Sequence, residues 1–338
     1  MRGLAVGRRW LPLILLGSSL LAGVAAASTA TPSDARGWLE RIHAAATQRN
    51  YQGTMVVAAG GMISSSKVAH YCVGDRTYER LEALDGRMQR VYRHNDTAHT
   101  VWPQERLVVV EKRGIATPSR ARVGAADPRA LEQYDLRIEG IERVAGRESQ
   151  VLLLRPRDEL RYAQRLWADT KSGLLLRADV IGPGRAVLES TAFSEVEIGV
   201  KAQPESVLQP VRQAEGWRVS KPRQAATSLD AEGWAIARDV PGFSLLGCVK
   251  RPLEVAGVTA GGAPEAGSVV QAVFSDGLAH VSLFIEPYAA RRHKSPVQGQ
   301  IGATGTLMQR RGDHWITAMG DVPPATLRLF VDAIERRP

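Results

Sequence analysis

The sequence predicts an α+β protein in which two antiparallel β-sheets each pack against helices. Three features of the 338-residue chain carry this prediction. One apolar stripe with helical spacing lies near the N-terminus, a second lies at the C-terminus, and strand-like segments joined by short turns fill most of the chain between them. Consecutive strands with short links pair antiparallel, because a parallel pair needs a long crossover connection.

Residues 1–27 have the pattern of a secretory signal peptide. Three arginines precede an apolar run from Leu11 to Val24, and three alanines follow it. The run is shorter than the roughly 18 apolar residues that indicate a membrane-spanning helix, and no cysteine follows the alanines to carry a lipid anchor. We therefore expect the mature chain to be exported and soluble.

The first predicted helix runs from Asp34 to Gln48, where apolar residues recur at helical spacing. Between the strands that follow it, Asp127 to Tyr134 is predicted as a short helix, because Asp127 suits its cap and Pro128 its first helical position. The predicted strands are Tyr51–Ala58, Ser66–Val73, Arg76–Leu84, Arg87–Arg93, Thr97–Pro103, Arg106–Lys112, Ser149–Arg155, Tyr162–Asp169 and Leu174–Ile181. Together these elements make the larger, N-terminal sheet of the prediction.

A polar segment punctuated by prolines, Pro204 to Gly233, marks a domain boundary. A chain of this length exceeds the ~100–200 residues of a usual single core, so two domains are expected. We assign residues 28–203 to the first domain, 204–225 to a linker and 226–338 to the second domain.

The second domain is predicted from strands at Trp234–Arg238 and Phe243–Arg251 and from a hairpin in the stretch FSDGLAHVSLFIEP. If Asp276 and Gly277 form a two-residue turn, all cross-strand pairs near it join apolar residues on one face. The expected pairs are Phe274 with Ala279, Ala272 with Val281 and Val270 with Leu283. A slip of one residue would move these side chains to the other face, so the pattern specifies the register strongly.

A C-terminal helix is predicted to cover the apolar face of this hairpin. Pro323 or Pro324 suits its first turn. Its apolar residues recur at helical spacing and are Leu327, Phe330, Val331 and Ile334. One helix on one antiparallel sheet makes a small α+β domain.

The two cysteines, Cys72 and Cys248, fall in different predicted domains. They could pair in an oxidising compartment, but two separate buried thiols are the simpler expectation. The formal net charge of +9 favours acidic partners such as phosphates, anionic lipid headgroups or acidic peptides. Its basic residues lack the dense clustering of a nucleic-acid-binding protein, so no nucleic-acid partner is expected.

Motifs for catalysis are weak. Ser64 and Lys67 match the S-x-x-K spacing of penicillin-binding enzymes, and Lys171-Ser172-Gly173 resembles their K-T-G. That mechanism needs the serine at the start of a helix, whereas Ser64 lies in a predicted turn before a strand. Converging carboxylates of a glycosidase cannot be recognised in one sequence and stay open, but we expect no enzyme.

No complete metal site or cofactor motif is expected either. His70 and Cys72 share one face of a predicted strand, but two ligands alone do not form a zinc site. His94 and His99 are placed by their spacing on opposite faces of an extended strand. The chain also lacks a dinucleotide fingerprint. We therefore predict structural or surface histidines and no cofactor.

Two sets of residues are better candidates for binding. A basic loop after the hairpin could contact phosphate or an acidic peptide, although a solvated loop is the alternative. Its candidate residues are Tyr288, Arg291, Arg292 and Lys294. Aromatic and methionine residues of the first domain could line a lipid pocket, although most could simply be core. These pocket candidates are Trp38, Tyr51, Met55, Val57, Met62, Trp102, Trp167 and Phe193.

Several stretches together resemble the MucB/RseB family of periplasmic sigma-factor regulators. They are NYQGTMVV, YERLEALDG, LWADTKSGLLLR, VPGF, FSDGLAHVSLFIE and ITAMGDVPPATLRLFVDAI. They span essentially the whole mature chain in the family's order, and the last two are the most specific. The Trp-Asp-turn-Gly-Leu strand pair is also similar to the LolA/LolB-type lipoprotein carriers.

The resemblance implies a LolA/LolB-like half-open antiparallel β-barrel over helices, followed by a smaller C-terminal domain. It also implies a periplasmic protein, held at the inner membrane by its partner, that binds the periplasmic segment of a single-pass anti-sigma factor of the RseA or MucA type. Binding would shield that segment from regulated proteolysis, and lipopolysaccharide or mislocalised lipoprotein acyl chains would release it.

Two other classes stay open from the residues alone. A periplasmic lipid or lipoprotein carrier would use the same half-barrel, but simple carriers lack a second domain such as the one predicted here. A structural scaffold protein is a further alternative. The sequence leaves a homo-oligomer open.

Overall fold

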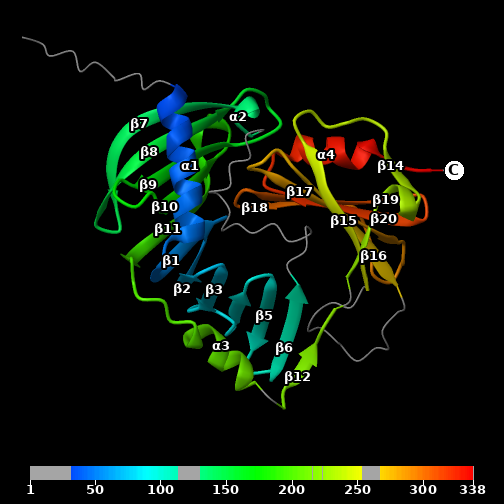
Figure 1. The fold of residues 1–338 in the computed structure, drawn as a ribbon. Coiled ribbons are helices and arrows are strands. Elements are labelled where there is room, and N and C mark those ends of the chain that lie inside the picture. The colour runs from blue at the N-terminus through cyan, green and yellow to red at the C-terminus, as the bar shows by residue number, and fades with distance from the viewer. Residues whose placement is uncertain (1–31, 113–129, 215, 223, 253–266, 338) are drawn as a thin grey trace, which may run out of the picture.

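The computed structural model describes residues 32–337 except 113–129, 215, 223 and 253–266. The predicted signal peptide and the first residues of the helix predicted at Asp127 lie outside the described residues. The described chain is mostly β-structure with few helices, arranged around two separate sheets (Figure 1). The predicted fold class, an antiparallel sheet over helices plus a smaller sheet with a packed helix, is confirmed.

The larger sheet has twelve strands in the described residues. In spatial order they are β12 (Arg218–Ser220), β6 (Leu107–Lys112), β5 (Thr97–Trp102), β4 (Arg90–His94), β3 (Arg76–Ala83), β2 (Met62–Val73), β1 (Tyr51–Ala59), β11 (Val187–Ile198), β10 (Leu175–Ile181), β9 (Ala163–Asp169), β8 (Arg147–Pro156) and β7 (Tyr134–Val144). Its ladders are antiparallel apart from the short β12–β6 pair, which is parallel. The order begins at β12 and ends at β7, so the sheet is open, as expected for a half-barrel.

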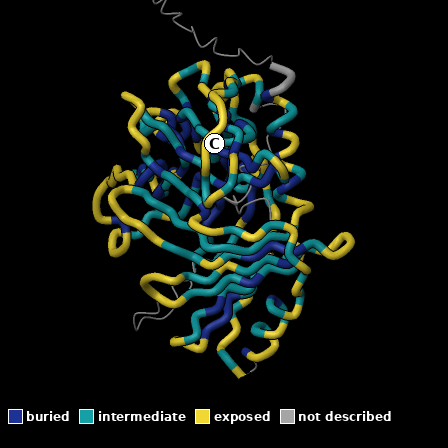
Figure 2. Tube along the Cα trace, turned by 90° about the vertical axis from the view of Figure 1, so that its left-hand side faces the viewer, coloured by how far each residue is buried: buried dark blue, intermediate teal, exposed yellow. Residues whose placement is uncertain are grey.

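The smaller sheet has seven strands in the described part of the chain. They lie in the order β13 (Ala225–Thr227), β15 (Ser244–Pro252), β16 (Ser268–Ser275), β17 (His280–Pro287), β20 (His314–Gly320), β19 (Thr304–Arg311) and β18 (Val297–Ile301). A separate pair joins β14 (Trp234–Ile236) to β21 (Ile334–Arg336). Figure 2 shows that buried residues lie along the strands and exposed residues at their connections.

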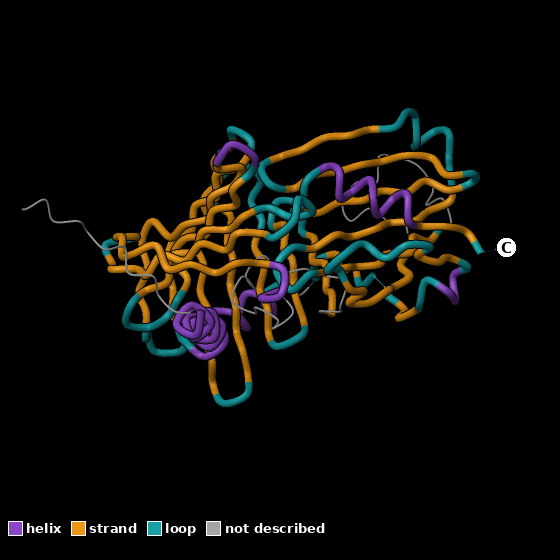
Figure 3. The backbone as a smooth tube through the Cα atoms, turned by 90° about the horizontal axis from the view of Figure 1, so that it is seen from above, coloured by secondary structure: helices purple, strands orange, loops and turns teal. Residues whose placement is uncertain are grey.

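Helix α1 (Pro32–Gln48) lies along one face of the larger sheet and is seen nearly end-on in Figure 3. Its buried residues Ala35, Leu39 and Ile42 pack with leucines of β8 and β9, so the predicted apolar stripe is confirmed. The short α2 (Ala130–Gln133) precedes β7. Among the described residues, 3₁₀ turns occupy Pro183–Arg185 and Asp230–Glu232.

The segment predicted as a linker contains two elements that belong with the larger sheet. Helix α3 (Glu205–Arg212) packs Val207 against Tyr71, Tyr78 and Tyr92. Strand β12 then extends the edge of the larger sheet by pairing with β6. The chain therefore passes to the smaller sheet between β12 and β13.

Helix α4 (Pro324–Ala333) covers the smaller sheet, as predicted. Its buried Phe330 contacts Phe274 of β16 and Phe243, with ring centroids 5.0 and 5.4 Å apart. The predicted stripe ends differently, because Ile334 is the first residue of β21 rather than a helical residue. It is nevertheless buried in the same core.

The predicted register of the β16–β17 hairpin is wrong by two residues. Asp276 Oδ1 accepts hydrogen bonds from the backbone N–H groups of Leu278 and Ala279, at 2.8 and 2.7 Å, and so centres the turn on Gly277-Leu278. The observed pairs are Phe274 with Val281, Ala272 with Leu283 and Val270 with Ile285. A shift of two residues preserves the face of every side chain, so the predicted apolar face still forms the core.

We predict that Phe330→Ala lowers the free energy of unfolding by about 3–5 kcal/mol, because it leaves a cavity between two aromatic rings. Urea unfolding followed by tryptophan fluorescence measures this. Leu329→Ala, on the same helix but 42% exposed, is the matched control and should change stability by less than about 0.5 kcal/mol. Equal losses in the two variants would contradict this account of the core.

Candidate functional site

A buried ion pair joins the two sheets. Arg161, in the loop between β8 and β9, places Nη1 3.0 Å from Oδ2 of Asp276 in the β16–β17 turn. Both side chains are 0% exposed. We call the contact between the sheets around this pair the seam. Since burying two charges costs several kcal/mol per ion, such a pair is stable only when hydrogen bonds satisfy its remaining groups.

The remaining groups of the pair are satisfied from both sides of the seam. Arg161 donates Nε–H to Asp158 at 3.0 Å and Nη2–H to the carbonyl of Pro241 at 2.9 Å. Its guanidinium carbon also lies 4.9 Å from the centroid of the Phe243 ring. Tyr134 donates its hydroxyl to Asp276 at 3.2 Å. Burial and the nearby Asp276 carboxylate raise the pKa of Tyr134 well above its usual value, so the phenol stays protonated as the donor.

Two further contacts extend the seam. Thr326, at the start of α4, donates its hydroxyl to the carbonyl of Leu160 at 2.8 Å. Gln300 of β18 donates an amide N–H to the Tyr162 hydroxyl at 3.3 Å. The loop before β9 therefore contacts the C-terminal domain through three consecutive residues, Leu160, Arg161 and Tyr162.

The turn between β18 and β19 also touches the tip of the β1–β2 hairpin. Gly302 has a φ of +59°, and a Cβ added there would lie 2.6 Å from Cβ of Ala59. Gly60 at the hairpin tip has a φ of +57°, and a Cβ added there would lie 3.2 Å from the backbone N of Gly302 and 3.3 Å from Cγ2 of Ile301. Only glycine fits this approach, because it has no Cβ and readily adopts positive φ.

A cavity of about 490 Å³ lies beside the seam, in the C-terminal domain. It is lined by Leu229, Ile236, Asp239, Val240, Pro241, Gly242, Phe243, Ser244, Leu245, Phe274 and Phe330. Two of these lining residues, Pro241 and Phe243, also contact Arg161. A ligand in this cavity would therefore press on the same loop that holds the buried arginine.

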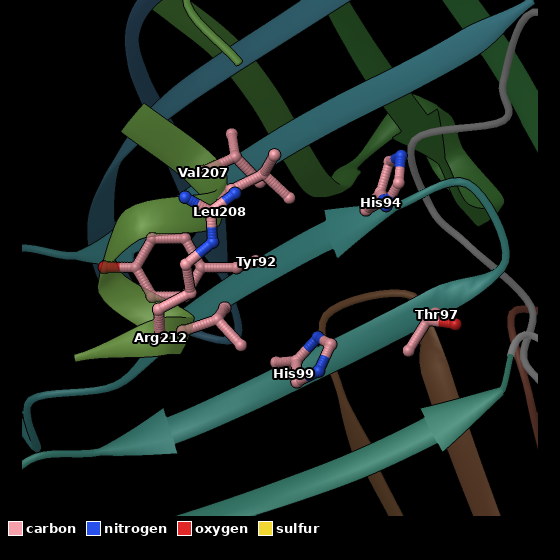
Figure 4. Close-up of a pocket in the computed structure, with 8 residues that line it drawn as sticks. Tyr92, His94, Thr97, His99, Val207, Leu208 and Arg212 are labelled. Carbon is pink, nitrogen blue, oxygen red and sulfur yellow. The ribbon is translucent and has the colours of Figure 1, made fainter. Parts of the chain in front are cut away.

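A second cavity, of about 250 Å³, lies between α3 and strands β4 and β5 (Figure 4). Its wall combines Tyr92, His94, Thr97 and His99 with Val207, Leu208, Val211 and Arg212. The prediction that His94 and His99 point to opposite faces is wrong, because a tight turn separates them and both line this cavity. Burial, with Lys221 and His94 nearby, lowers the pKa of His99 and favours its neutral form.

None of the predicted pocket residues of the first domain lines either of these two cavities. Tyr51, Met55 and Phe193 pack with Leu174 and Leu176 under α1. Trp38 packs elsewhere along α1, and Val57 shares the face of Tyr51 and Met55 towards the exposed Met62 at the hairpin tip. The sequence neighbours of Trp167 and Trp102 belong to the core clusters, so the two tryptophans point to the opposite face of the sheet. Trp167 instead donates its indole N–H to Glu142 at 2.8 Å, and Trp102 lies beside Arg87.

The predicted basic loop divides into held and exposed residues. Arg292 lies 3.1 Å from Glu286, and Arg310 lies over the ring of Tyr288 at 4.1 Å. The side chains of Arg291 and Lys294 are exposed. The loop is anchored by His293, whose ring stacks on Trp315 at 4.7 Å.

Sequence reasoning missed exposed apolar residues on both sides of the seam. Met62 and Ile63 are 58% and 72% exposed at the start of β2, and Val297 and Ile301 are 49% and 59% exposed on β18. We call these four residues the seam surface. The exposed methionine was recognised only as a pocket candidate, and no local pattern indicated that β18 would lie beside it.

The S-x-x-K spacing noted in the sequence does not lie in the setting that the penicillin-binding mechanism needs. Ser64 and Lys67 lie within strand β2 and not at a helix start. No group of three or more metal-ligating side chains comes together among the described residues. None of the helices that the structure describes has the length and apolar character needed to cross a bilayer.

Two family models match the chain. Residues 34–211 match the MucB/RseB N-terminal domain, and residues 228–335 match the MucB/RseB C-terminal domain. The sigma factor AlgU regulatory protein MucB of Pseudomonas aeruginosa is 31% identical over 320 residues, which cover 93% of each chain. The sigma-E factor regulatory protein RseB of Haemophilus influenzae is 24% identical over 97% of this chain and 99% of that protein.

Solved structures are also similar. A crystal structure of MucB in complex with MucA(peri) has a TM-score of 0.65 and 26% identity, and covers 90% of this chain and 100% of that one. A complex structure of Pseudomonas aeruginosa MucA/MucB has a TM-score of 0.66 and 26% identity, with 90% and 99% coverage. The similarity therefore includes both sheets.

We predict that Asp276→Asn lowers the free energy of unfolding by about 3 kcal/mol, because it leaves the buried Arg161 without its main counter-charge. The amide oxygen can still hold the turn, so the variant tests the charge. Asp135→Asn is the matched control, since Asp135 also pairs with an arginine at 3.0 Å but with both side chains more than half exposed. Exposed pairs contribute about 0–1 kcal/mol. Urea unfolding measures both, and equal effects would contradict the importance of the seam pair.

Proposed function

The chain belongs to the MucB/RseB family, and from this premise we propose that it binds the periplasmic segment of a transmembrane anti-sigma factor. In this proposal the bound segment is shielded from regulated proteolysis, so that the sigma factor stays captive. The protein works in the periplasm and meets the inner membrane only through its partner. The observation that carries the proposal is the match over both domains to MucB in complex with MucA(peri).

The seam surface is the proposed docking site for that segment. It is apolar, exposed and built from both domains. Strand β18 ends the smaller sheet and is exposed at all five residues. An edge strand offers backbone N–H and C=O groups to an extended peptide, while neighbouring apolar side chains add specificity. An extended, partly apolar anti-sigma segment is therefore the occupant we propose.

Lipid would act on the same seam in this proposal. The cavity of about 490 Å³ beside Phe243 could take a few methylene groups of an acyl chain from lipopolysaccharide or a mislocalised lipoprotein. Each buried methylene contributes about 0.8 kcal/mol. Because the lining loop also contacts Arg161, lipid in the cavity would favour a different arrangement of the two sheets at the seam. That arrangement would bind the anti-sigma segment less tightly.

We predict that Ile301→Asp and Met62→Asp each weaken binding of the periplasmic segment of the cognate MucA-type anti-sigma factor at least tenfold. Each places a charge in the proposed apolar contact. Calorimetry measures the affinity, and the rate at which an added protease cleaves the segment gives a second readout. Ile141→Asp is the control, because Ile141 is 63% exposed on β7, at the far edge of the larger sheet. Unchanged affinity in both seam variants would exclude this surface.

We predict that the double variant Arg291→Glu/Lys294→Glu weakens binding of lipopolysaccharide or of the anti-sigma segment at low salt. The loss should shrink as ionic strength rises, because screening removes the contribution of exposed charges. The control is Lys171→Glu/Lys201→Glu, which makes the same change in net charge at two other exposed positions. Affinities for both ligands that match the wild type across a salt series would remove the basic loop from the mechanism.

A further inference from the structure

A cysteine, a histidine and a carboxylate lie in line on the larger sheet, away from the seam. Cys72 and His70 share one face of β2, as predicted, and Cys72 Sγ lies 3.3 Å from Nε2 of His70. The other ring nitrogen, Nδ1, lies 3.3 Å from Oε1 of Glu79 on β3. A nucleophile within reach of a base, and a base oriented by a third group, is the arrangement that activates thiols and hydroxyls.

The histidine is held in place from several sides. Its ring is 5% exposed and stacks on Tyr51 of β1, with centroids 5.3 Å apart. The carboxylate that orients it is fixed in turn by Arg93 of β4 at 3.0 Å. The hydrogen bonds from His70 and Arg93 outweigh burial and lower the pKa of Glu79 to about 2, so this group stays ionised. The ionised carboxylate can stabilise an imidazolium.

The thiol rests in its protonated form. Burial, with the charge of Glu79 added, raises the pKa of Cys72. Its S–H lies 2.9 Å from the carbonyl of Thr47, in the last turn of α1. Reaction at neutral pH therefore needs a base to remove the proton during attack, and His70 is placed to do this.

Cys248 provides a contrast within the same chain. It is buried at 6% exposure in the core of the smaller sheet, whereas Cys72 is partly exposed. Burial, with Glu232 nearby, raises the pKa of Cys248 to about 11. The two cysteines are unpaired, so each thiol is available for comparison in one molecule.

We propose that Cys72 is a modification site that exchanges with low-molecular-weight disulfides, with His70 as its general base. Sγ attacks one sulfur of the small disulfide, the bond between the two sulfurs of that molecule breaks, and a new disulfide bond forms at Cys72. The proton passes from Sγ through Nε2 of His70 to the departing thiolate. Cys72 is thus oxidised to a mixed disulfide, and the departing half of the molecule is reduced to a thiol.

Modification would alter how α1 is attached. The mixed disulfide removes the S–H donor of the Thr47 carbonyl and adds bulk beside the end of the helix. The same corner is held by Asn50, which accepts the backbone N–H of Cys72 at 2.8 Å and donates to the carbonyl of Val200 at 3.1 Å. The ratio of oxidised to reduced small thiols would in this way change how firmly α1 is attached to the larger sheet.

The test uses the full mature chain with Cys248→Ser, so that Cys72 is the remaining thiol. The probe is 5,5′-dithiobis(2-nitrobenzoate), a small aromatic disulfide whose thiolate product is coloured. We expect one equivalent to react in the native protein, and His70→Gln to slow the reaction by about 100-fold, the lower end of general-base catalysis. Glu79→Gln should slow it less, because the base remains but loses its orienting charge.

His94→Gln is the matched control, since His94 also stacks on a tyrosine, at 4.7 Å from Tyr78, but has no thiol beside it. In urea, all variants should react at the same rate. A His70→Gln rate equal to that of the control would overturn the proposal. If His70→Gln does not fold, the Cys248→Ser protein is compared in its native and urea-unfolded states at pH 7. A native Cys72 that reacts more slowly than the unfolded one would also overturn the proposal.

Discussion

The buried pair of Arg161 and Asp276 is the interaction on which the arrangement of the two domains depends. Each charge comes from a different sheet, and neither is exposed. The same carboxylate shapes its own turn through Oδ1 while it binds the arginine through Oδ2. The hairpin turn, the loop at Pro241 and the phenol of Tyr134 are therefore fixed together, because the turn supplies Asp276, Pro241 accepts from Arg161 and Tyr134 donates to Asp276.

This constraint connects the fold to the proposed function. The seam surface exists only while the tip of the β1–β2 hairpin lies against the β18–β19 turn, since its residues come from both domains. A ligand that favours a different arrangement of the two sheets would separate the residues of the proposed docking surface without contacting the partner. A ligand with equal affinity for both arrangements would shift nothing, so a regulator of this kind needs a site that senses the seam. In the proposed mechanism, the cavity beside Phe243 is that site, because its lining loop also contacts Arg161.

The regular elements could be predicted where one face is uniformly apolar. The stripes of α1 and α4 and the faces of the β16–β17 hairpin follow from spacing alone, because burial on one side imposes a period on the sequence. Strands β7 and β11 were missed because charged residues such as Glu139, Glu142 and Glu195 interrupt their apolar pattern at exposed positions. Pairing with neighbours, rather than their own pattern, holds these strands in the sheet.

The sequence by itself determined the expectation of an export signal, the two-sheet fold class, the buried faces of α1, α4 and the β16–β17 hairpin, and the family resemblance. The tertiary structure alone decided the site. Asp276 was recognised as a turn residue, but its role as the partner of Arg161 depends on a contact between residues 115 positions apart. Likewise, β2 alone places Cys72 near His70, whereas only its pairing with β3 brings Glu79 opposite His70. The spacing of residues within one element predicts which face a side chain occupies. The partner on that face depends on how segments distant in the sequence pack together.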